Sequence, residues 1–472
     1  MKAKAVLPFV AMLAFSTLAQ AEVVTEMTST AADRSGTAVT VYNDNLALVK
    51  ERRKLNLPAG PVRLSLREVS AQLQAETALL RAVTGKPITL IEQNFDFDLL
   101  TPQKLLDKYV GHEVTVIRTI PFNGAETREK ATVLAAGQGT VLRFADRIET
   151  GVPGRIVYDS VPPNLRDRPT LSVLFDGAGG NQTVELSYLS GGLSWKADYV
   201  AELAADGKSL DLSGWVTLTN SSGASYDNAN LQLVAGTVNR MANRQPMSLG
   251  KMARAEMVDN AVAAPREESL ADYHLYTFER PTTLAENQTK QLALLSASNV
   301  PAEREYLLAG AEYYYQSRYD ALGEKLKPAV FLIFQNKGGQ LGKPLPAGTV
   351  RAYARDSQGA AQFVGEDHIE HTAKNETVRL RLGEAFDITA ERKQTSYKRI
   401  NDRVAETSYR IVIRNAKREV VVVKVQEPLP GDWEITQESQ KHTKTSAHTA
   451  QWNVVIPAEG STTLEYTARV KW

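Results

Sequence analysis

Hydrophobic and polar residues alternate along most of this chain, which is the pattern of half-buried β-strands. The alternation is clearest toward the C-terminal end, in residues 408–414, 451–456 and 463–470. Short turns that are polar or contain Pro and Gly separate these runs, as in a β-sandwich. The pattern predicts an all-β fold of tandem β-sandwich domains, with one or two short helices.

One segment carries the signals of a short helix. Thr101 is placed to cap its start, Pro102 falls in its first turn, and Gly111 follows where a helix would end. Strand-like runs come next, within residues 113–144. A helix followed by such strands suggests a small SH3- or Sm-like barrel near residues 101–160, inserted in the N-terminal half.

The first 21 residues have the pattern of a cleavable secretory signal. Two lysines open it, an uncharged apolar run follows, and Ala-Gln-Ala at 19–21 places small residues where a signal peptidase cleaves. The apolar run is shorter than the roughly 20 residues that a membrane-spanning helix needs. We therefore expect cleavage after Ala21, export to the bacterial periplasm, and no transmembrane segment in the mature chain.

Composition narrows the setting and the chemistry. The 472 residues contain no cysteine, which excludes disulfides, thiolate metal sites and a cysteine nucleophile. An exported protein without disulfides is expected in a bacterial envelope, because small domains secreted by animals are usually rich in disulfides. Lysine and arginine number 55 against 54 aspartates and glutamates, so no overall charge draws the chain to nucleic acid.

Breaks in the alternation divide the chain into regions. Residues 22–190 are predicted to form an N-terminal β-rich region, 191–398 a central β domain, and 399–472 a C-terminal β-sandwich-like domain. Residues 240–270 lack period-two alternation and are rich in Met, Ala, Arg and Glu. We expect them to form a mobile loop within the central domain.

Several strings resemble one group of exported bacterial proteins. They are Val-Tyr-Asn-Asp-Asn-Leu-Ala-Leu-Val-Lys at 41–50, Gly-Gly-Leu-Ser-Trp-Lys-Ala-Asp-Tyr-Val at 191–200, and Gly-Glu-Asp-His at 365–368. They are similar to a domain-of-unknown-function family described as mucoidy-inhibitor-A-like, most strongly from about Gly191 to the C-terminus. The resemblance implies export and a β-rich fold, but no reaction and no catalytic residue. The coiled coil of typical relatives is not matched here.

Candidate metal ligands gather in one short segment. His368 and His371 lie beside Glu366 and Glu370, and imidazoles with carboxylates suit Zn²⁺ or another divalent ion. On a strand, however, residues three apart point to opposite faces, so the two histidines would diverge. A polar strand edge or turn accounts for the segment better, and we expect no metal or other cofactor.

Aromatic residues cluster in a second segment. On a strand, Tyr313, Tyr315 and Tyr319 would line one face, with Arg318 close by. Tyrosine rings beside an arginine can stack on sugars or form a protein interface. An ordinary amphipathic strand is the alternative, because aromatic residues are favoured in strands.

No nucleophile elbow and no phosphate-binding loop is found in the sequence, and no catalytic residue can be named. The sequence favours a non-catalytic binding or scaffolding protein that presents sheet edges and loops to an envelope protein or a polysaccharide. Two alternatives stay open. One is a hydrolase of cell-wall or exported polysaccharide that uses carboxylates or a histidine-bound metal, and the other is a passive structural protein of the envelope.

Overall fold

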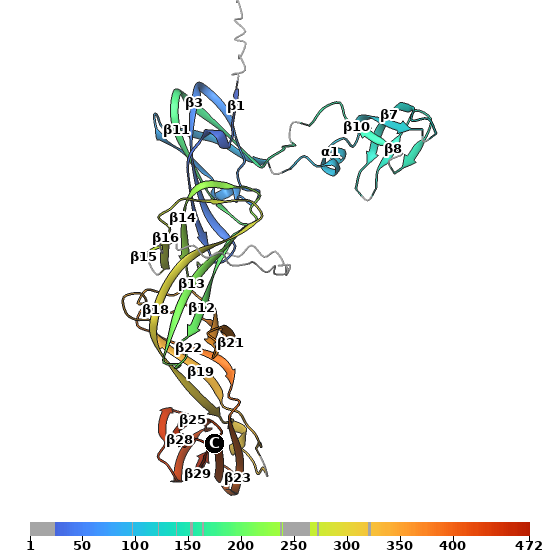
Figure 1. Cartoon of the computed structure of the whole chain (residues 1–472). Coiled ribbons are helices and arrows are strands. Elements are labelled where there is room, and N and C mark those ends of the chain that lie inside the picture. Colours follow the sequence, from blue (N-terminus) through green and yellow to red (C-terminus); the bar gives the residue numbers. More distant parts are fainter. Residues whose placement is uncertain are drawn as a thin grey trace, which may run out of the picture. The chain divides into compact units, whose positions relative to one another are not determined.

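The computed structural model describes residues 24–472, except 97, 121, 138, 152–153, 163–164, 237, 239–264, 271–272 and 320–321. The predicted signal at 1–21 and most of the predicted loop at 240–270 lie outside the described residues. Strands make up most of what is described (Figure 1), which confirms the all-β prediction. Within the described part of the chain, no helix has the length and apolar character needed to cross a membrane.

The chain divides into two compact units. The first comprises the residues up to Thr37 and Val49–Ser190, and the second comprises Ala38–Leu48 and Gly191–Trp472. The hairpin of β2 (Arg34–Tyr42) and β3 (Leu46–Arg67) therefore contributes its tip to the second unit. The domain boundaries drawn from the sequence stay predictions.

The first unit is organised around β3 and β11 (Thr170–Ser190). β11 pairs antiparallel with β5 along its first half and with β4 along its second, and β1 pairs parallel with β3. The neighbouring elements are β1 (Thr25–Ser29), the 3₁₀ helices η1 (Ala31–Asp33) and η2 (Ala75–Thr77), β4 (Leu79–Thr84) and β5 (Thr89–Asp96).

A helix and a five-stranded sheet occupy the region of the predicted small barrel, whose SH3- or Sm-like character stays a prediction. Helix α1 (Pro102–Lys108) begins where the Thr101 side chain accepts a hydrogen bond from Lys104 N, at 3.2 Å. An antiparallel sheet in the order β10-β6-β7-β8-β9 follows, and its core includes Leu106 of the helix. Its strands are β6 (Glu113–Thr119), β7 (Glu126–Ala135), β8 (Val141–Arg143), β9 (Ile148–Thr150) and β10 (Arg155–Val157).

The second unit contains a sheet that curls round on itself, which we call the central barrel. Its strands pair in the order β21-β20-β12-β13-β18-β19-β22. They are β12 (Leu193–Leu203), β13 (Ser209–Asn220), β18 (Gln288–Ala309), β19 (Ala329–Gln335), β20 (Gly348–Arg355), β21 (Ala361–Ile369) and β22 (Thr377–Glu384).

The two outer strands of this order, β21 and β22, meet without a ladder of paired backbone residues in the described part of the chain. The Asp367 carboxylate instead accepts a hydrogen bond from Arg381 N at 2.7 Å. Gly365 lies so close to β22 that a Cβ there would be 2.4 Å from Leu382 O. We call this contact the seam of the central barrel, because it closes the sheet.

A further group of strands in the second unit pairs with the hairpin tip. β14 (Tyr226–Ala235) runs parallel to β2, from Asn230 opposite Ala38 to Val234 opposite Tyr42. β14 also pairs antiparallel with β16 and β17, and β16 with β15. The remaining bounds here are β15 (Arg266–Leu270), β16 (Tyr273–Thr277) and β17 (Thr282–Leu284).

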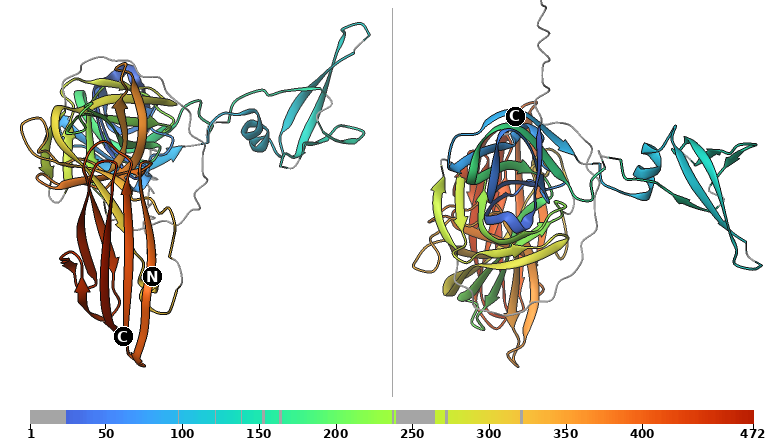
Figure 2. Two further views of the ribbon diagram at one scale, coloured as in Figure 1. Left: turned by 60° about the horizontal axis from the view of Figure 1, so that its bottom comes forward. Right: turned by 90° about the horizontal axis from the view of Figure 1, so that it is seen from above.

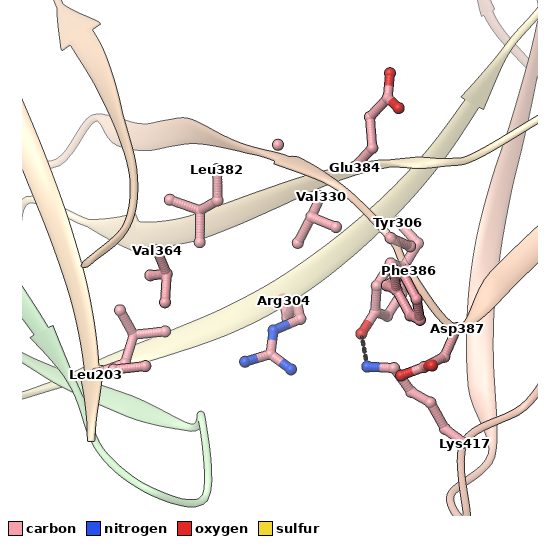
Figure 3. Close-up of a pocket in the computed structure, with 13 residues that line it drawn as sticks. Leu203, Arg304, Tyr306, Val330, Val364, Leu382, Glu384, Phe386, Asp387 and Lys417 are labelled. Atoms are coloured by element: carbon pink, nitrogen blue, oxygen red, sulfur yellow. Dashed lines mark hydrogen bonds between the residues drawn. The ribbon is translucent and has the colours of Figure 1, made fainter. Parts of the chain in front are cut away.

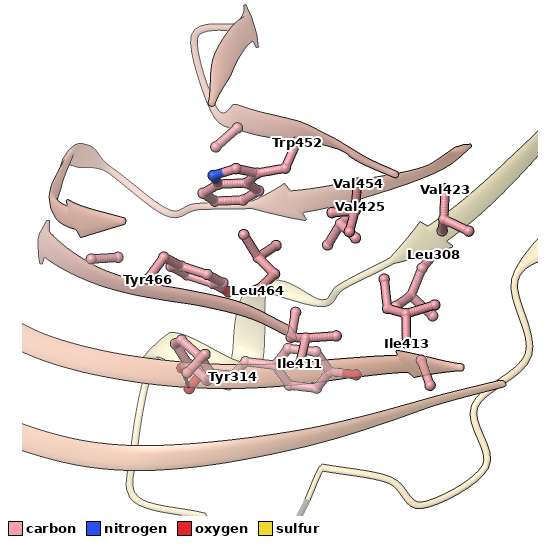
Figure 4. Close-up of a cluster of buried hydrophobic side chains, with 14 of the residues drawn as sticks. Leu308, Tyr314, Ile411, Ile413, Val423, Val425, Trp452, Val454, Leu464 and Tyr466 are labelled. Carbon is pink, nitrogen blue, oxygen red and sulfur yellow. Dashed lines mark hydrogen bonds between the residues drawn. The ribbon is translucent and has the colours of Figure 1, made fainter. Parts of the chain in front are cut away.

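A β-sandwich completes the second unit, as the C-terminal alternation predicted. One sheet has the order β23-β24-β29-β26, and the other joins the end of β18 to β25, β28 and β27. Side chains of both sheets fill the core between them (Figure 4), where Trp452 stacks on Tyr466 at 4.6 Å between ring centroids. The strands are β23 (Ile388–Asn401), β24 (Val404–Asn415), β25 (Val421–Pro428), β26 (Asp432–Glu438), β27 (Thr443–Ser446), β28 (Thr449–Ile456) and β29 (Ser461–Lys471).

The sandwich also draws on residues that precede 399. Leu308 at the end of β18, Tyr315 of the 3₁₀ helix η3 (Glu312–Tyr315) and Ile388 of β23 all belong to its core. β18 thus serves the barrel along most of its length and the sandwich at its end. Figure 2 shows these long strands from two further directions.

Candidate binding site at the mouth of the central barrel

Strand β18 changes its neighbours partway along. It pairs with β13 up to Pro301 and with β25 from Tyr306 onward. Near the intervening residues 302–305, a hollow of about 250 Å³ opens at one end of the central barrel. We call this hollow the barrel mouth, and Figure 3 shows it. Its walls are Leu203, Arg304, Tyr306, Val330, Ala354, Val364, residues 382–387 and Lys417.

Arg304 occupies a position on the buried face of β18. Residues two apart on a strand point to the same face, and Val300, Tyr306 and Leu308 on this face of β18 are buried. Arg304 interrupts that stripe and is exposed within the mouth. Figure 3 shows its guanidinium among aliphatic side chains from several strands, namely Leu203, Val330, Val364 and Leu382.

The charge of Arg304 has no counterion among the residues that the structure describes. Its neighbour Glu305 is held elsewhere, because Arg379 donates to its carboxylate at 2.7 Å and Lys424 pairs with it as well. These hydrogen bonds keep the pKa of Glu305 below its ordinary value, although its partial burial acts in the opposite direction. The Glu384 carboxylate, on the rim, points away from Arg304 in Figure 3.

A second cation of the mouth is already engaged. Lys417 Nζ donates to the Tyr306 hydroxyl at 2.6 Å, and it lies 3.9 Å from the Glu419 carboxylate. Lys417 therefore has partners that hold it at the wall. Arg304 is the cation that remains available to a ligand.

An exposed aromatic ring stands on the rim. Phe386 is 83 % exposed, whereas Ala385 and Ile388 on either side of it are buried in the sandwich core. Backbone hydrogen bonds of 2.8 Å fix both flanks, from Ala385 N to Pro328 O and from Ala416 N to Asp387 O. The ring is thus presented to solvent by a well-anchored backbone, with Lys327 Nζ 5.1 Å from its centroid.

This arrangement is suited to binding. Mouths of β-barrels are frequent ligand sites, and such sites combine apolar walls with a few placed polar groups. Aliphatic walls, one uncompensated guanidinium and an exposed ring fit a ligand with an apolar body and an anionic group.

The structure places the sequence-predicted metal candidates in other contacts. Glu366 pairs with Arg351 at 3.3 Å, and His371 Nδ1 accepts a hydrogen bond from Ala347 N at 3.1 Å. Partial burial lowers the pKa of His371. His368 lies on β21, and Glu370 and His371 follow its end. Over the described ranges, no three or more His, Cys, Asp or Glu side chains gather so that they could hold a metal ion.

The predicted strand through the tyrosine cluster is wrong, since η3 covers Glu312–Tyr315. Tyr315 is completely buried, and its hydroxyl donates to Glu427 Oε2 at 3.1 Å. It therefore belongs to the sandwich core and cannot be part of an exposed surface. Tyr313 is half exposed and contacts Tyr319 edge to face. A binding role of Tyr313, Arg318 and Tyr319 stays a prediction.

Sequence reasoning missed the two residues that define the mouth. A signal for Arg304 exists, because it is the one charged residue in the alternating series Val300, Ala302, Arg304, Tyr306, Leu308. Phe386, in the string Glu-Ala-Phe-Asp at 384–387, has no such signal. Its exposure follows from how the chain passes between barrel and sandwich.

Comparison with known proteins places the chain in a family. The family model described as "Domain of unknown function (DUF4139)" matches residues 184–472, which include the central barrel, its mouth and the C-terminal sandwich. No curated protein matches the chain. Because the match covers more than half of the 472 residues, the chain belongs to the DUF4139 family, a family of unknown function.

Proposed function

We propose that this protein is exported to the bacterial periplasm and acts there as a non-catalytic binding protein that holds an envelope partner at the barrel mouth. The leader-like N-terminal sequence and the resemblance to mucoidy-inhibitor-A-like proteins support export. The observation that carries the binding role is the guanidinium of Arg304, which has no counterion among the described residues and lies between aliphatic walls.

A purely structural barrel has no need of such a residue. Inward positions of small barrels are normally filled by side chains that pack together. An aliphatic residue at 304 would pack against Val330 and Leu382 and would extend the stripe of Val300 and Leu308. An arginine at this position lacks this packing, and an ion pair between its guanidinium and an anionic group of the partner would explain its presence.

Of the two kinds of partner that the sequence suggests, the mouth favours a protein. Polysaccharides present many hydroxyl groups, which require hydrogen-bonding side chains or flat aromatic platforms. Branched aliphatic side chains from β12, β19, β21 and β22 surround Arg304, beside the charged and aromatic residues that also line the hollow. Aliphatic walls with an arginine and an exposed phenylalanine resemble the buried centre of protein interfaces.

Photo-crosslinking in living cells tests the proposal. A photo-reactive phenylalanine analogue at position 386 should form an adduct with one envelope protein, and Arg304→Glu should abolish that adduct. The matched control carries the analogue at Val455, which is 54 % exposed on β28 and does not line the mouth. Identical adducts from positions 386 and 455, or an adduct that persists with Arg304→Glu, would contradict the proposal. Absence of any adduct would favour a passive structural protein.

A further inference from the structure

We infer that the barrel mouth recognises the C-terminal carboxylate of a polypeptide whose last side chain is apolar. The inference rests on the proposed function and specifies the partner by chemistry. Three features of the mouth support it, namely its charge, its volume and its rim.

The positive charge of Arg304 is suited to binding one compact anion. A guanidinium binds a carboxylate through two parallel hydrogen bonds, which gives both strength and orientation. Arg304 is the cation of the mouth without a partner among the described residues. The other cation, Lys417, is bound to Tyr306. The neighbouring acid, Glu305, is bound to Arg379 and Lys424. Glu384 and Asp387 also line the hollow, but no ion pair joins either of them to Arg304 among the described residues, so a ligand carboxylate can pair with this guanidinium.

The volume calls for one side chain beside that carboxylate. An apolar cavity of roughly 150 Å³ holds a benzene-sized group. The mouth, at about 250 Å³, has room for one large side chain together with a carboxylate. Leu203, Val364 and Leu382 supply aliphatic contacts for that side chain.

The exposed ring on the rim favours a ligand that continues outside the mouth. Phe386 lines the hollow yet is 83 % exposed, and hydrogen bonds of Ala385 and Asp387 hold its backbone in place. A small free acid would fill the hollow and leave most of this ring in water. A polypeptide end would place its last residue inside and lay the preceding residues over the ring, a known mode of carboxylate capture at chain ends.

Calorimetric titration of the chain from Glu22 to Trp472 with paired peptides tests the inference. The probe is an octapeptide that ends in Phe-Leu with a free carboxylate, and its twin carries a C-terminal amide. We expect the amide to bind at least tenfold more weakly than the acid. Arg304→Gln should reduce binding of the acid to the level of the amide and leave binding of the amide unchanged.

Two control variants accompany these titrations. Arg128→Gln removes an exposed arginine from β7 of the first unit and should leave both affinities unchanged. Phe386→Ala should weaken both peptides, because the ring contacts the residues before the last one. Thermal unfolding of each variant checks that the fold is retained.

Four results would overturn the inference. Equal affinity of acid and amide would exclude carboxylate recognition, as would an Arg304→Gln variant that binds the acid normally. If 4-phenylbutyrate binds as tightly as the peptide acid, the mouth recognises a free organic acid and not the end of a polypeptide. If neither peptide binds while the probe at position 386 still captures an envelope protein, the inference fails and the proposed function stands.

Discussion

The side chain of Asn45 accepts a hydrogen bond from the backbone N–H of Gly192, at 2.9 Å across 147 residues of sequence. Asn45 lies at the tip of the β2–β3 hairpin, and Gly192 lies in the turn between β11 and β12. Asn43 adds a bond of 3.4 Å to Trp195 O. The two strings that carry the family resemblance most clearly therefore meet in space. Their shared role is to fix the hairpin tip against the start of the central barrel.

Replacing Asn45 should reveal this contact as a loss of stability. Asn45 has a positive φ of 47°, which glycine adopts without strain and alanine does not. We expect Asn45→Gly to lower the free energy of unfolding by about 1 kcal/mol, the value of one hydrogen bond. Asn45→Ala should cost roughly 1–2 kcal/mol more, because it adds the left-handed strain. Urea unfolding measures both, and an Asn45→Gly variant as stable as the original chain would contradict the role of the bond.

The sandwich core contains an ion pair whose loss should be severe. Arg392 Nη2 donates to Glu427 Oε1 at 2.6 Å, and neither side chain is exposed. Removal of one partner leaves a buried charge, so Arg392→Met or Glu427→Gln should each cost about 3–5 kcal/mol. The double variant Arg392→Met, Glu427→Leu should cost less than the sum of the single changes.

An exposed pair in the same sandwich provides the control. Arg410 and Glu465 lie 2.6 Å apart with both side chains about half exposed, and such pairs contribute at most about 1 kcal/mol. Arg410→Met should therefore change the denaturant midpoint only slightly. Equal losses for Arg392→Met and Arg410→Met would show that the buried pair has no special weight.

Closure of the central barrel at its seam should depend on a glycine. A Cβ at Gly365 would lie 2.4 Å from Leu382 O, so Gly365→Ala must push β21 away from β22. Gly383 has a similar φ, 144° against 151°, but nothing lies within 4 Å of its Cβ position. Gly383→Ala is thus matched for backbone strain. We expect faster amide hydrogen exchange in β21 and β22 for Gly365→Ala only, and equal exchange in the two variants would contradict the prediction.

Acid should weaken the first unit through Glu185. This largely buried carboxylate on β11 accepts hydrogen bonds from Arg52 of β3 at 2.9 Å and from Arg81 of β4. These bonds, that of Arg52 foremost, lower the pKa of Glu185 below its ordinary value. The unfolded chain then binds the proton more readily than the folded chain does, so stability falls as pH decreases.

The pH range of this effect follows from the direction of the shift. The contribution of Glu185 is fully present above the pKa of an unfolded glutamate, about 4.3, and is lost as the pH falls through the lower folded value. Denaturant midpoints between pH 7 and pH 3 should drop less steeply for Glu185→Gln than for the unmodified chain. Parallel curves would show that Glu185 does not carry the acid sensitivity.

Processing of the N-terminus is the most direct check on export. If residues 1–21 are a signal peptide, the protein recovered from the periplasmic fraction should begin at Glu22, as intact mass spectrometry can show. Ala21→Arg should block cleavage, because the peptidase requires a small residue there. Recovery of the unprocessed chain from the cytoplasm would contradict the proposed location.

Several features follow from the sequence because they depend on neighbouring residues. Alternation predicted the strand at 408–414, and in β24 Tyr409, Ile411 and Ile413 are indeed buried while Arg410 and Arg414 are exposed. The Thr101 cap and the following Pro likewise predicted α1. Such patterns need only the geometry of one strand or one helical turn.

The tyrosine cluster shows where this local reasoning ends. Its residues favour a strand, yet the chain forms the 3₁₀ helix η3, in which Tyr315 is buried against Glu427 and Tyr466. A buried carboxylate needs hydrogen-bond donors, and a tyrosine hydroxyl supplies one. Packing against residues more than a hundred positions away thus outweighed the local preference for a strand.

The sequence by itself determined that this chain forms sheets, because alternation is a property of successive residues on one strand. The tertiary structure alone decided which strand ends surround Arg304, because β18 passes from β13 to β25 only once distant strands have paired. The barrel mouth brings Leu203 together with Val364 and Leu382, which are more than 150 residues further along the chain. Its chemistry depends on that long-range pairing, and no local pattern encodes it.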